Sequence, residues 1–136
     1  MDDRTLLMKA AEARNHSYSP YSEYSVGAAL LTKTGKVYTG CNVENAAFTP
    51  GNCAERTAVF KAVSEGESKF DAIAIIGGKH GTEGEPAWPC GVCRQVLNEF
   101  ADNKTFRVIT GTCGGEIKSL TLGELLPFAF GPENLS

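Results

Sequence analysis

Two short strand-like runs, the first of them almost entirely apolar, constrain the fold of this 136-residue chain more than any other feature. Residues 70–76 and 105–110 have the length of strands, and such runs are typical of strands that a sheet buries on both faces. A helical pattern precedes each run, at residues 53–65 and 90–101. Because crossovers between parallel strands are right-handed, we expect a mixed sheet with helices on its faces.

The N-terminal part of the chain predicts one helix and one hairpin. Apolar side chains recur at helical spacing over residues 5–16. Residues 24–31 and 36–40 are predicted to pair as a β-hairpin around a turn at residues 34–35, Thr-Gly.

Local signals also predict where elements begin and end. Asn52 is a good N-cap for the predicted helix at residues 53–65, and Gly66 is placed to end that helix. Residues 77–89 are rich in Gly and Pro and are expected to form a loop, and residues 116–119 a strand. Residues 121–124, TLGE, have the spacing of a capping box and predict a short final helix.

The composition fits one folded domain spanning residues 1–136. With 42% hydrophobic and 21% charged residues, the chain does not belong to the disordered, collagen-like or fibrous classes. A formal charge of −3 argues against nucleic acid or an anionic membrane as partner, and no run reaches the ~18 apolar residues of a membrane span. The first residues, MDDR, show no signal pattern, so we expect a cytoplasmic protein with a small-molecule substrate.

The cysteines are the strongest indication of chemistry. There are five, and an odd number without an export signal favours metal binding or redox chemistry over disulfides. Cys53 falls at one predicted helix start, and Cys90 and Cys93 fall at another with the spacing of metal ligands. Helix N-termini stabilise thiolates, and three thiolates suit zinc with a fourth position left open. The Cys-x-x-Cys pair alone also fits a redox pair, a structural zinc half-site or two buried thiols.

Three motifs resemble those of the small cytidine deaminases: NVENAA at residues 42–47, CAERTA at 53–58 and PCGVCRQ at 89–95. The resemblance extends over nearly the whole chain. It implies a three-layer α/β/α sandwich around a five-stranded mixed sheet, and a homotetramer whose active sites are shared between subunits. It also implies one Zn²⁺ per subunit and the hydrolysis of cytidine and deoxycytidine to uridine and deoxyuridine, with release of ammonia.

The same resemblance implies roles for two residues beside Cys53. Glu55 would move a proton from the water on zinc to ring atom N3 and later to the departing amine, while the zinc-bound hydroxide attacks C4. Arg56 would donate hydrogen bonds to the ligand sulfurs, which matters because three thiolates and Zn²⁺ sum to a charge of −1. The ordinary alternatives are a charge that favours the helix N-terminus for Glu55 and a surface arginine for Arg56.

Substrate contacts are implied at six further positions. Asn42 and Glu44 resemble the family's ribose contacts, and Ala54 the residue whose backbone meets the pyrimidine edge. A carboxylate near the sugar disfavours a phosphate, so a free nucleoside is expected. The aromatic positions are Tyr24 beside the base, Phe48 at a subunit boundary and Phe130 reaching a neighbouring subunit's base; all three are also compatible with ordinary core packing.

Two other functions remain open from the sequence. The zinc and carboxylate chemistry would also serve deamination of a related amino-heterocycle, such as an aminopyrimidine nucleoside antibiotic, although Asn42 and Glu44 favour an ordinary nucleoside. A noncatalytic, zinc-stabilised interaction module is the alternative from another class, and it leaves Glu55 unexplained.

Overall fold

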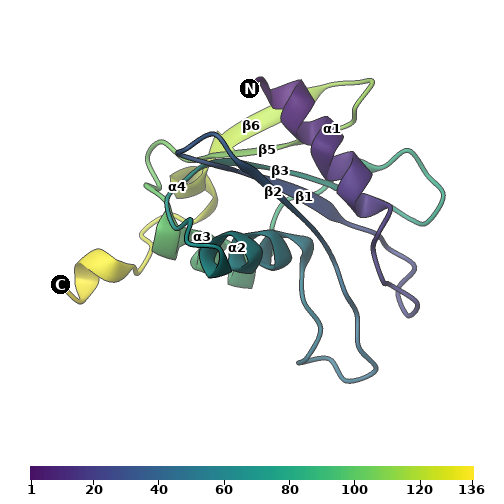
Figure 1. Ribbon diagram of the computed structural model, residues 1–136, viewed down its shortest axis with the longest axis horizontal. Coiled ribbons are helices and arrows are strands. Elements are labelled where there is room, and N and C mark those ends of the chain that lie inside the picture. Colours follow the sequence, from purple (N-terminus) through teal and green to yellow (C-terminus); the bar gives the residue numbers. More distant parts are fainter.

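A twisted mixed sheet forms the centre of the protein, which the computed structural model describes over residues 1–136 (Figure 1). The main path of the sheet runs β2-β1-β3-β5-β6, and only β3 and β5 pair in parallel. A short strand, β4, adds to β3, so the sheet has six strands rather than the five that were expected. The strands are β1 (Gly27–Thr32), β2 (Val37–Cys41), β3 (Phe70–Gly77), β4 (Glu85–Pro86), β5 (Arg107–Gly111) and β6 (Ile117–Thr121).

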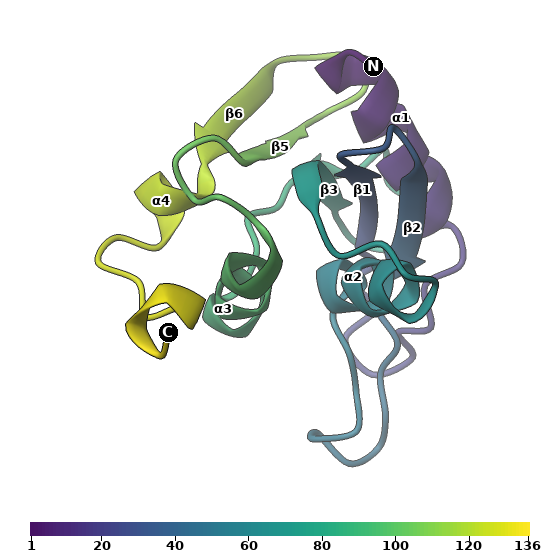
Figure 2. The same ribbon diagram turned by 60° about the vertical axis from the view of Figure 1, so that its left-hand side comes forward.

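Helices cover both faces of this sheet. Helix α1 (Asp3–Arg14) lies on one face, and α2 (Ala54–Ser64) and α3 (Gly91–Phe100) lie together on the other, as Figures 1 and 2 show. A short helix, α4 (Leu122–Leu125), and a 3₁₀ turn at Pro132–Asn134 end the chain. Because helices cover both faces of the sheet, the expected α/β/α layering is confirmed. None of these helices combines the length and the hydropathy needed to cross a membrane.

The core has two halves because successive side chains of a strand point to opposite faces. Ile73 and Ile75 of β3 pack toward α2 and α3, whereas Ala72, Ala74 and Ile76 pack toward α1. Both sets are fully buried. This two-sided burial explains why the run at residues 70–76 is almost continuously apolar rather than alternating.

The helix that carries Cys53 lies very close to β2. A Cβ atom added to Gly40 would lie 2.6 Å from the carbonyl oxygen of Ala54 and 2.6 Å from the amide nitrogen of Ala58. Only glycine therefore fits at this position of β2 without moving the first turn of α2. The close approach fixes the first turn of α2, which follows Cys53, against β2.

Several expected boundaries are wrong by a few residues, and two have clear causes. Asn52 is not the N-cap of α2: its backbone pairs with Val43, and Cys53 occupies the N-cap position. The expected loop at residues 77–89 contains β4, because the backbone there returns to pair with the end of β3. Two other predicted boundaries are confirmed. Gly66 follows the end of α2, and the Thr121–Glu124 capping box begins α4.

Candidate metal centre and active site

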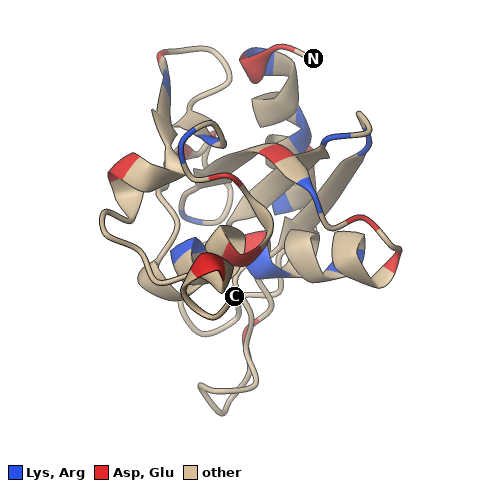
Figure 3. Ribbon diagram, turned by 90° about the vertical axis from the view of Figure 1, so that its left-hand side faces the viewer, with Lys and Arg blue, Asp and Glu red and all other residues tan.

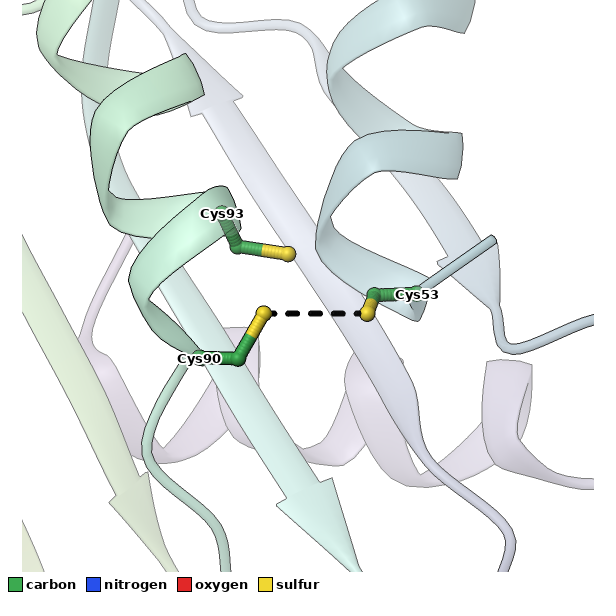
Figure 4. Close-up of side chains that lie close together, drawn as sticks. All are labelled: Cys53, Cys90 and Cys93. Carbon is green, nitrogen blue, oxygen red and sulfur yellow. Dashed lines mark hydrogen bonds between the residues drawn. The ribbon is translucent and has the colours of Figure 1, made fainter. Parts of the chain in front are cut away.

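Three cysteine sulfurs converge between the starts of α2 and α3 (Figure 4). Cys53 and Cys90 are the N-cap residues of the two helices, and neither uses its side chain to cap a backbone N–H. Cys93 lies in the first turn of α3 and is fully buried. The three sulfurs lie within 4.8 Å of one another, and those of Cys53 and Cys90 are 3.9 Å apart.

This arrangement fits a zinc ion. Tetrahedral zinc with Zn–S bonds of about 2.3 Å places its sulfur ligands about 3.8 Å apart, close to the Cys53–Cys90 separation. The group contains no histidine, aspartate or glutamate. The other two cysteines, Cys41 and Cys113, lie outside it. A donor set of three thiols is the set expected at a catalytic zinc site whose fourth ligand comes from outside the protein.

Arg56 supplies positive charge to the sulfurs. Its Nη2 donates a hydrogen bond to the Cys53 Sγ at 3.3 Å, and its Nε is buried with no partner. Hydrogen bonding to the Cys93 thiol and the nearby Arg56 guanidinium hold the pKa of Cys53 well below its ordinary value. The hydrogen bond between the Cys93 thiol and Cys53, together with burial, raises the pKa of Cys93. The site therefore stabilises thiolate at Cys53 before any metal is considered.

Glu55 is a buried carboxyl beside this cluster. It lies in the first turn of α2, is only 5% exposed, and lines the same cavity as Cys53 and Cys90. Burial raises the pKa of Glu55 to about 7, and the Cys53 thiolate also acts in this direction. A carboxyl with a pKa near neutrality can both accept and release a proton at physiological pH.

The thiols and Glu55 lie at a cavity of about 740 Å³. The structure places six of the predicted residues around it, in addition to Cys53 and Cys90: Tyr24, Asn42, Glu44, Phe48, Ala54 and Glu55. Arg56 also reaches its wall. Residues far apart in the sequence thus meet at one hollow, which is large enough for a small ligand.

Asn42 and Glu44 are held in place by the segment at residues 17–26. The Asn42 side chain contacts Ser17, Tyr24 and Val26. The Glu44 carboxylate accepts hydrogen bonds from the backbone N–H groups of residues 21 and 22 and from the Ser22 hydroxyl. The hydrogen bond from the Ser22 hydroxyl is the main reason that the pKa of Glu44 is lowered, so this carboxylate stays ionised at neutral pH.

The aromatic residues divide into two groups. Tyr24 lies on the cavity wall with its hydroxyl against Gly77, where an added Cβ would be 2.6 Å away. Phe48 lines the cavity but is fully exposed at the tip of its loop. Phe130 does not line the cavity, and its ring is more than half exposed, while its carbonyl accepts hydrogen bonds from Gln95 and Asn98 of α3.

The residues that hold Asn42 and Glu44 were not predicted from the sequence. Ser17 and Ser22 lie in a stretch rich in Ser, Tyr and Pro, whose composition indicates only a loop. Trp88 also lines the cavity. No local pattern could have revealed these contacts, because they join segments about 20 residues or more apart.

Comparisons with known proteins agree with the metal-centred site. Residues 1–109 match the family model described as the cytidine and deoxycytidylate deaminase zinc-binding region. The chain therefore belongs to the cytidine and deoxycytidylate deaminase family, a zinc-binding family, and its three converging cysteines form a group that could hold the metal.

Similar proteins are known in sequence and in structure. A cytidine deaminase of Sporosarcina psychrophila is 48% identical over 136 residues, which cover all of this chain and 96% of the relative. The crystal structure of a cytidine deaminase from Burkholderia pseudomallei matches with a TM-score of 0.85 and 45% identity, covering 96% of this chain and all of the other. A blasticidin-S deaminase of Bacillus cereus is 30% identical over 113 residues, 80% of this chain and 79% of the relative.

Proposed function

We propose that this single-domain protein hydrolyses free cytidine and deoxycytidine to uridine and deoxyuridine and releases ammonia. The observation that carries the proposal is the placement of buried Glu55 beside three converging thiols at the end of a cavity. The high identity to cytidine deaminases along the full chain supports the same reaction. One zinc ion per subunit would be held by Cys53, Cys90 and Cys93.

Held by Cys53, Cys90 and Cys93, a zinc ion would supply a more acidic water as the nucleophile for C4. Glu55 accepts a proton from this water and passes it to N3 of the pyrimidine ring. A C4–O bond forms, and Glu55 then transfers the second proton of the water to the exocyclic amine. The C4–N bond breaks and ammonia leaves, so the carboxylate ends in the state in which it began. A pKa of about 7 suits both directions of transfer.

Recognition of the substrate is assigned to the remaining cavity residues. Asn42 and Glu44 contact the sugar hydroxyls, the backbone of Ala54 meets the pyrimidine edge, and Tyr24 packs beside the base. The ionised Glu44 repels a 5′-phosphate, which favours a nucleoside over a nucleotide.

We further propose a homotetramer with active sites shared between subunits, acting in pyrimidine salvage in the cytoplasm. Residues 45–54 carry no charged side chain, and this loop projects from the body of the protein (Figure 3). Its Phe48 is fully exposed, and Phe128 and Phe130 are exposed near the C-terminus. Exposed aromatic side chains of this kind are typical of protein interfaces. Phe48 would lie at such a boundary, and Phe130 would reach the base bound by a neighbouring subunit.

The test is the fall in ultraviolet absorbance as cytidine becomes uridine, measured with zinc-loaded and with chelated protein. We expect turnover only in the zinc-loaded form. Blasticidin S is assayed in parallel because of the relative named above, and faster turnover of blasticidin S than of cytidine would favour the antibiotic as substrate. A zinc-loaded protein inactive on both compounds would instead point to a noncatalytic zinc module.

A further inference from the structure

The side chain of Asn42 has only one possible orientation. Its Oδ1 lies 2.9 Å from the backbone N–H of Val26, which can only donate. Its Nδ2 lies 2.9 Å from the backbone carbonyl of Tyr24, which can only accept. Exchanging the two atoms of the amide would place donor against donor and acceptor against acceptor. The backbone therefore defines which atom is oxygen.

This orientation gives a direction to a chain of hydrogen bonds that leads away from the cavity. The Ser17 hydroxyl lies 2.5 Å from Asn42 Oδ1 and must donate to it. Since its proton is then used, Ser17 accepts from Ser19, whose hydroxyl is 3.0 Å away. Ser19 is buried, and its hydroxyl lies 2.7 Å from Nε2 of His80 and 3.4 Å from the Ser25 hydroxyl. Since its proton goes to Ser17, Ser19 can only accept from these two groups. A chain with this direction requires the His80 proton on Nε2.

After these contacts, Asn42 has one N–H of Nδ2 left for a ligand, because its oxygen already accepts two hydrogen bonds. The Glu44 carboxylate, also on the cavity wall, can only accept while it is ionised. Together the two side chains offer a donor and an acceptor, which is the complement of a sugar hydroxyl.

We propose that Ser17, Ser19 and His80 are positioning residues for sugar recognition, acting as a directed hydrogen-bond chain that holds the Asn42 amide toward the sugar. The inference rests on the proposed function, because it takes the sugar to be bound at Asn42. Hydrogen bonds aligned in one direction polarise one another, so each link strengthens the next. None of the three residues touches the reacting atoms, and their effect is on sugar binding.

The first test compares two substrates on the zinc-loaded enzyme: cytidine and 2′,3′-dideoxycytidine, which lacks the 2′- and 3′-hydroxyls of the sugar but keeps the 5′-hydroxyl. For Ser17→Ala we expect kcat/KM on cytidine to fall about three- to tenfold, mainly through KM, as for loss of one neutral hydrogen bond. The value on dideoxycytidine should change less than twofold. Ser17→Thr keeps the hydroxyl and should restore the preference.

Two controls separate positioning from stability. Ser64→Ala makes the same chemical change at an exposed hydroxyl that bonds only within α2, and should leave both substrates unaffected. If Ser17→Ala folds poorly, Ser19→Ala breaks the chain one link further away and should also impair cytidine selectively. Equal losses on the two substrates in these variants would overturn the positioning role. A wild-type enzyme inactive on cytidine would instead refute the proposed function itself.

The second test does not depend on activity. Nitrogen-15 NMR of the histidine side chains should place the His80 proton on Nε2, with a resolved N–H signal because the hydrogen bond to Ser19 slows exchange. Both histidines are exposed, and His16, whose ring makes no hydrogen bond, serves as the internal reference. Ser19→Ala should remove the His80 signal, whereas Ser64→Ala should keep it. A neutral His80 protonated on Nδ1, or an N–H signal unaffected by Ser19→Ala, would overturn the proposed chain.

Discussion

The Arg56 guanidinium donates a hydrogen bond from Nη2 to the sulfur of Cys53 at 3.3 Å. The contact joins two residues of the same helical turn and brings a full positive charge to a cluster of three thiols. Bound zinc and three thiolates have a net charge of −1, so the arginine offsets this excess charge.

Replacing Arg56 should therefore weaken the metal site without unfolding the protein. For Arg56→Gln we expect zinc affinity or turnover to fall by about 10- to 100-fold, as is typical when a partner of a metal ligand is removed. Competition with a chromophoric chelator measures the affinity, and circular dichroism checks the fold. Wild-type affinity together with wild-type turnover would remove this role from Arg56.

Removing the carboxylate of Glu55 should separate binding from catalysis. Glu55→Gln keeps the size of the side chain but cannot take up the proton, so we expect deamination to fall by at least about 10²- to 10⁴-fold. Zinc content and nucleoside binding should be retained, as measured by metal analysis and calorimetry. Turnover within tenfold of wild type would contradict the proton transfer assigned to Glu55.

The raised pKa of Glu55 should also make the free energy of unfolding of the zinc-free protein depend on pH. Burial raises its pKa from 4.5 to about 7, so between these pH values the folded state binds more protons than the unfolded state. The free energy of unfolding therefore falls as pH rises through this window, by at most about 3 kcal/mol, and the penalty is absent below it.

Glu55→Gln should lack this penalty. Urea denaturation of chelated, reduced protein from pH 4.5 to 8 should show the variant gaining stability relative to wild type as pH rises. The comparison cancels the titration of groups common to both proteins. A stability difference that is independent of pH would show that the pKa of Glu55 is not raised in the folded state.

The three converging thiols should be distinguishable from the other cysteines by metal analysis. Cys90→Ala is expected to lose zinc binding and activity, because it removes one of three protein ligands. Cys113→Ala makes the same change outside the cluster and should bind one zinc per chain. Full zinc occupancy in Cys90→Ala would mean that the metal is held elsewhere.

Shared active sites can be tested by mixing two inactive variants. If Phe130 reaches a neighbouring subunit, a chain with Phe130→Ala and a chain with Glu55→Gln can complement each other when assembled together. With random assembly of equal amounts, about a quarter of the sites would then combine an intact Glu55 with an intact Phe130. Activity no higher than the mean of the two parents would contradict a shared site, and sedimentation analysis reports the oligomeric state directly.

The layered fold could be predicted from the sequence because the patterns that indicate its helices and strands are local. The run at residues 70–76 is apolar throughout since β3 is buried on both faces, and this pattern survives in the sequence without knowledge of the partners. Boundaries were less accurate at Asn52, where a backbone pairing with Val43 displaced the expected cap. Strand β4 was missed because a strand as short as Glu85–Pro86 has no periodicity to detect.

By itself, the sequence determined which elements form and which side chains are near each other along one helix: Cys90 with Cys93, and Cys53 with Glu55 and Arg56. Only the tertiary structure decided that Cys53 meets Cys90, which is 37 residues away, that Glu55 is desolvated, and that Ser17 holds Asn42. The reason is physical: helical periodicity and spacing depend on neighbours within a few residues. Burial and the meeting of distant side chains depend on how the sheet packs its helices and loops together.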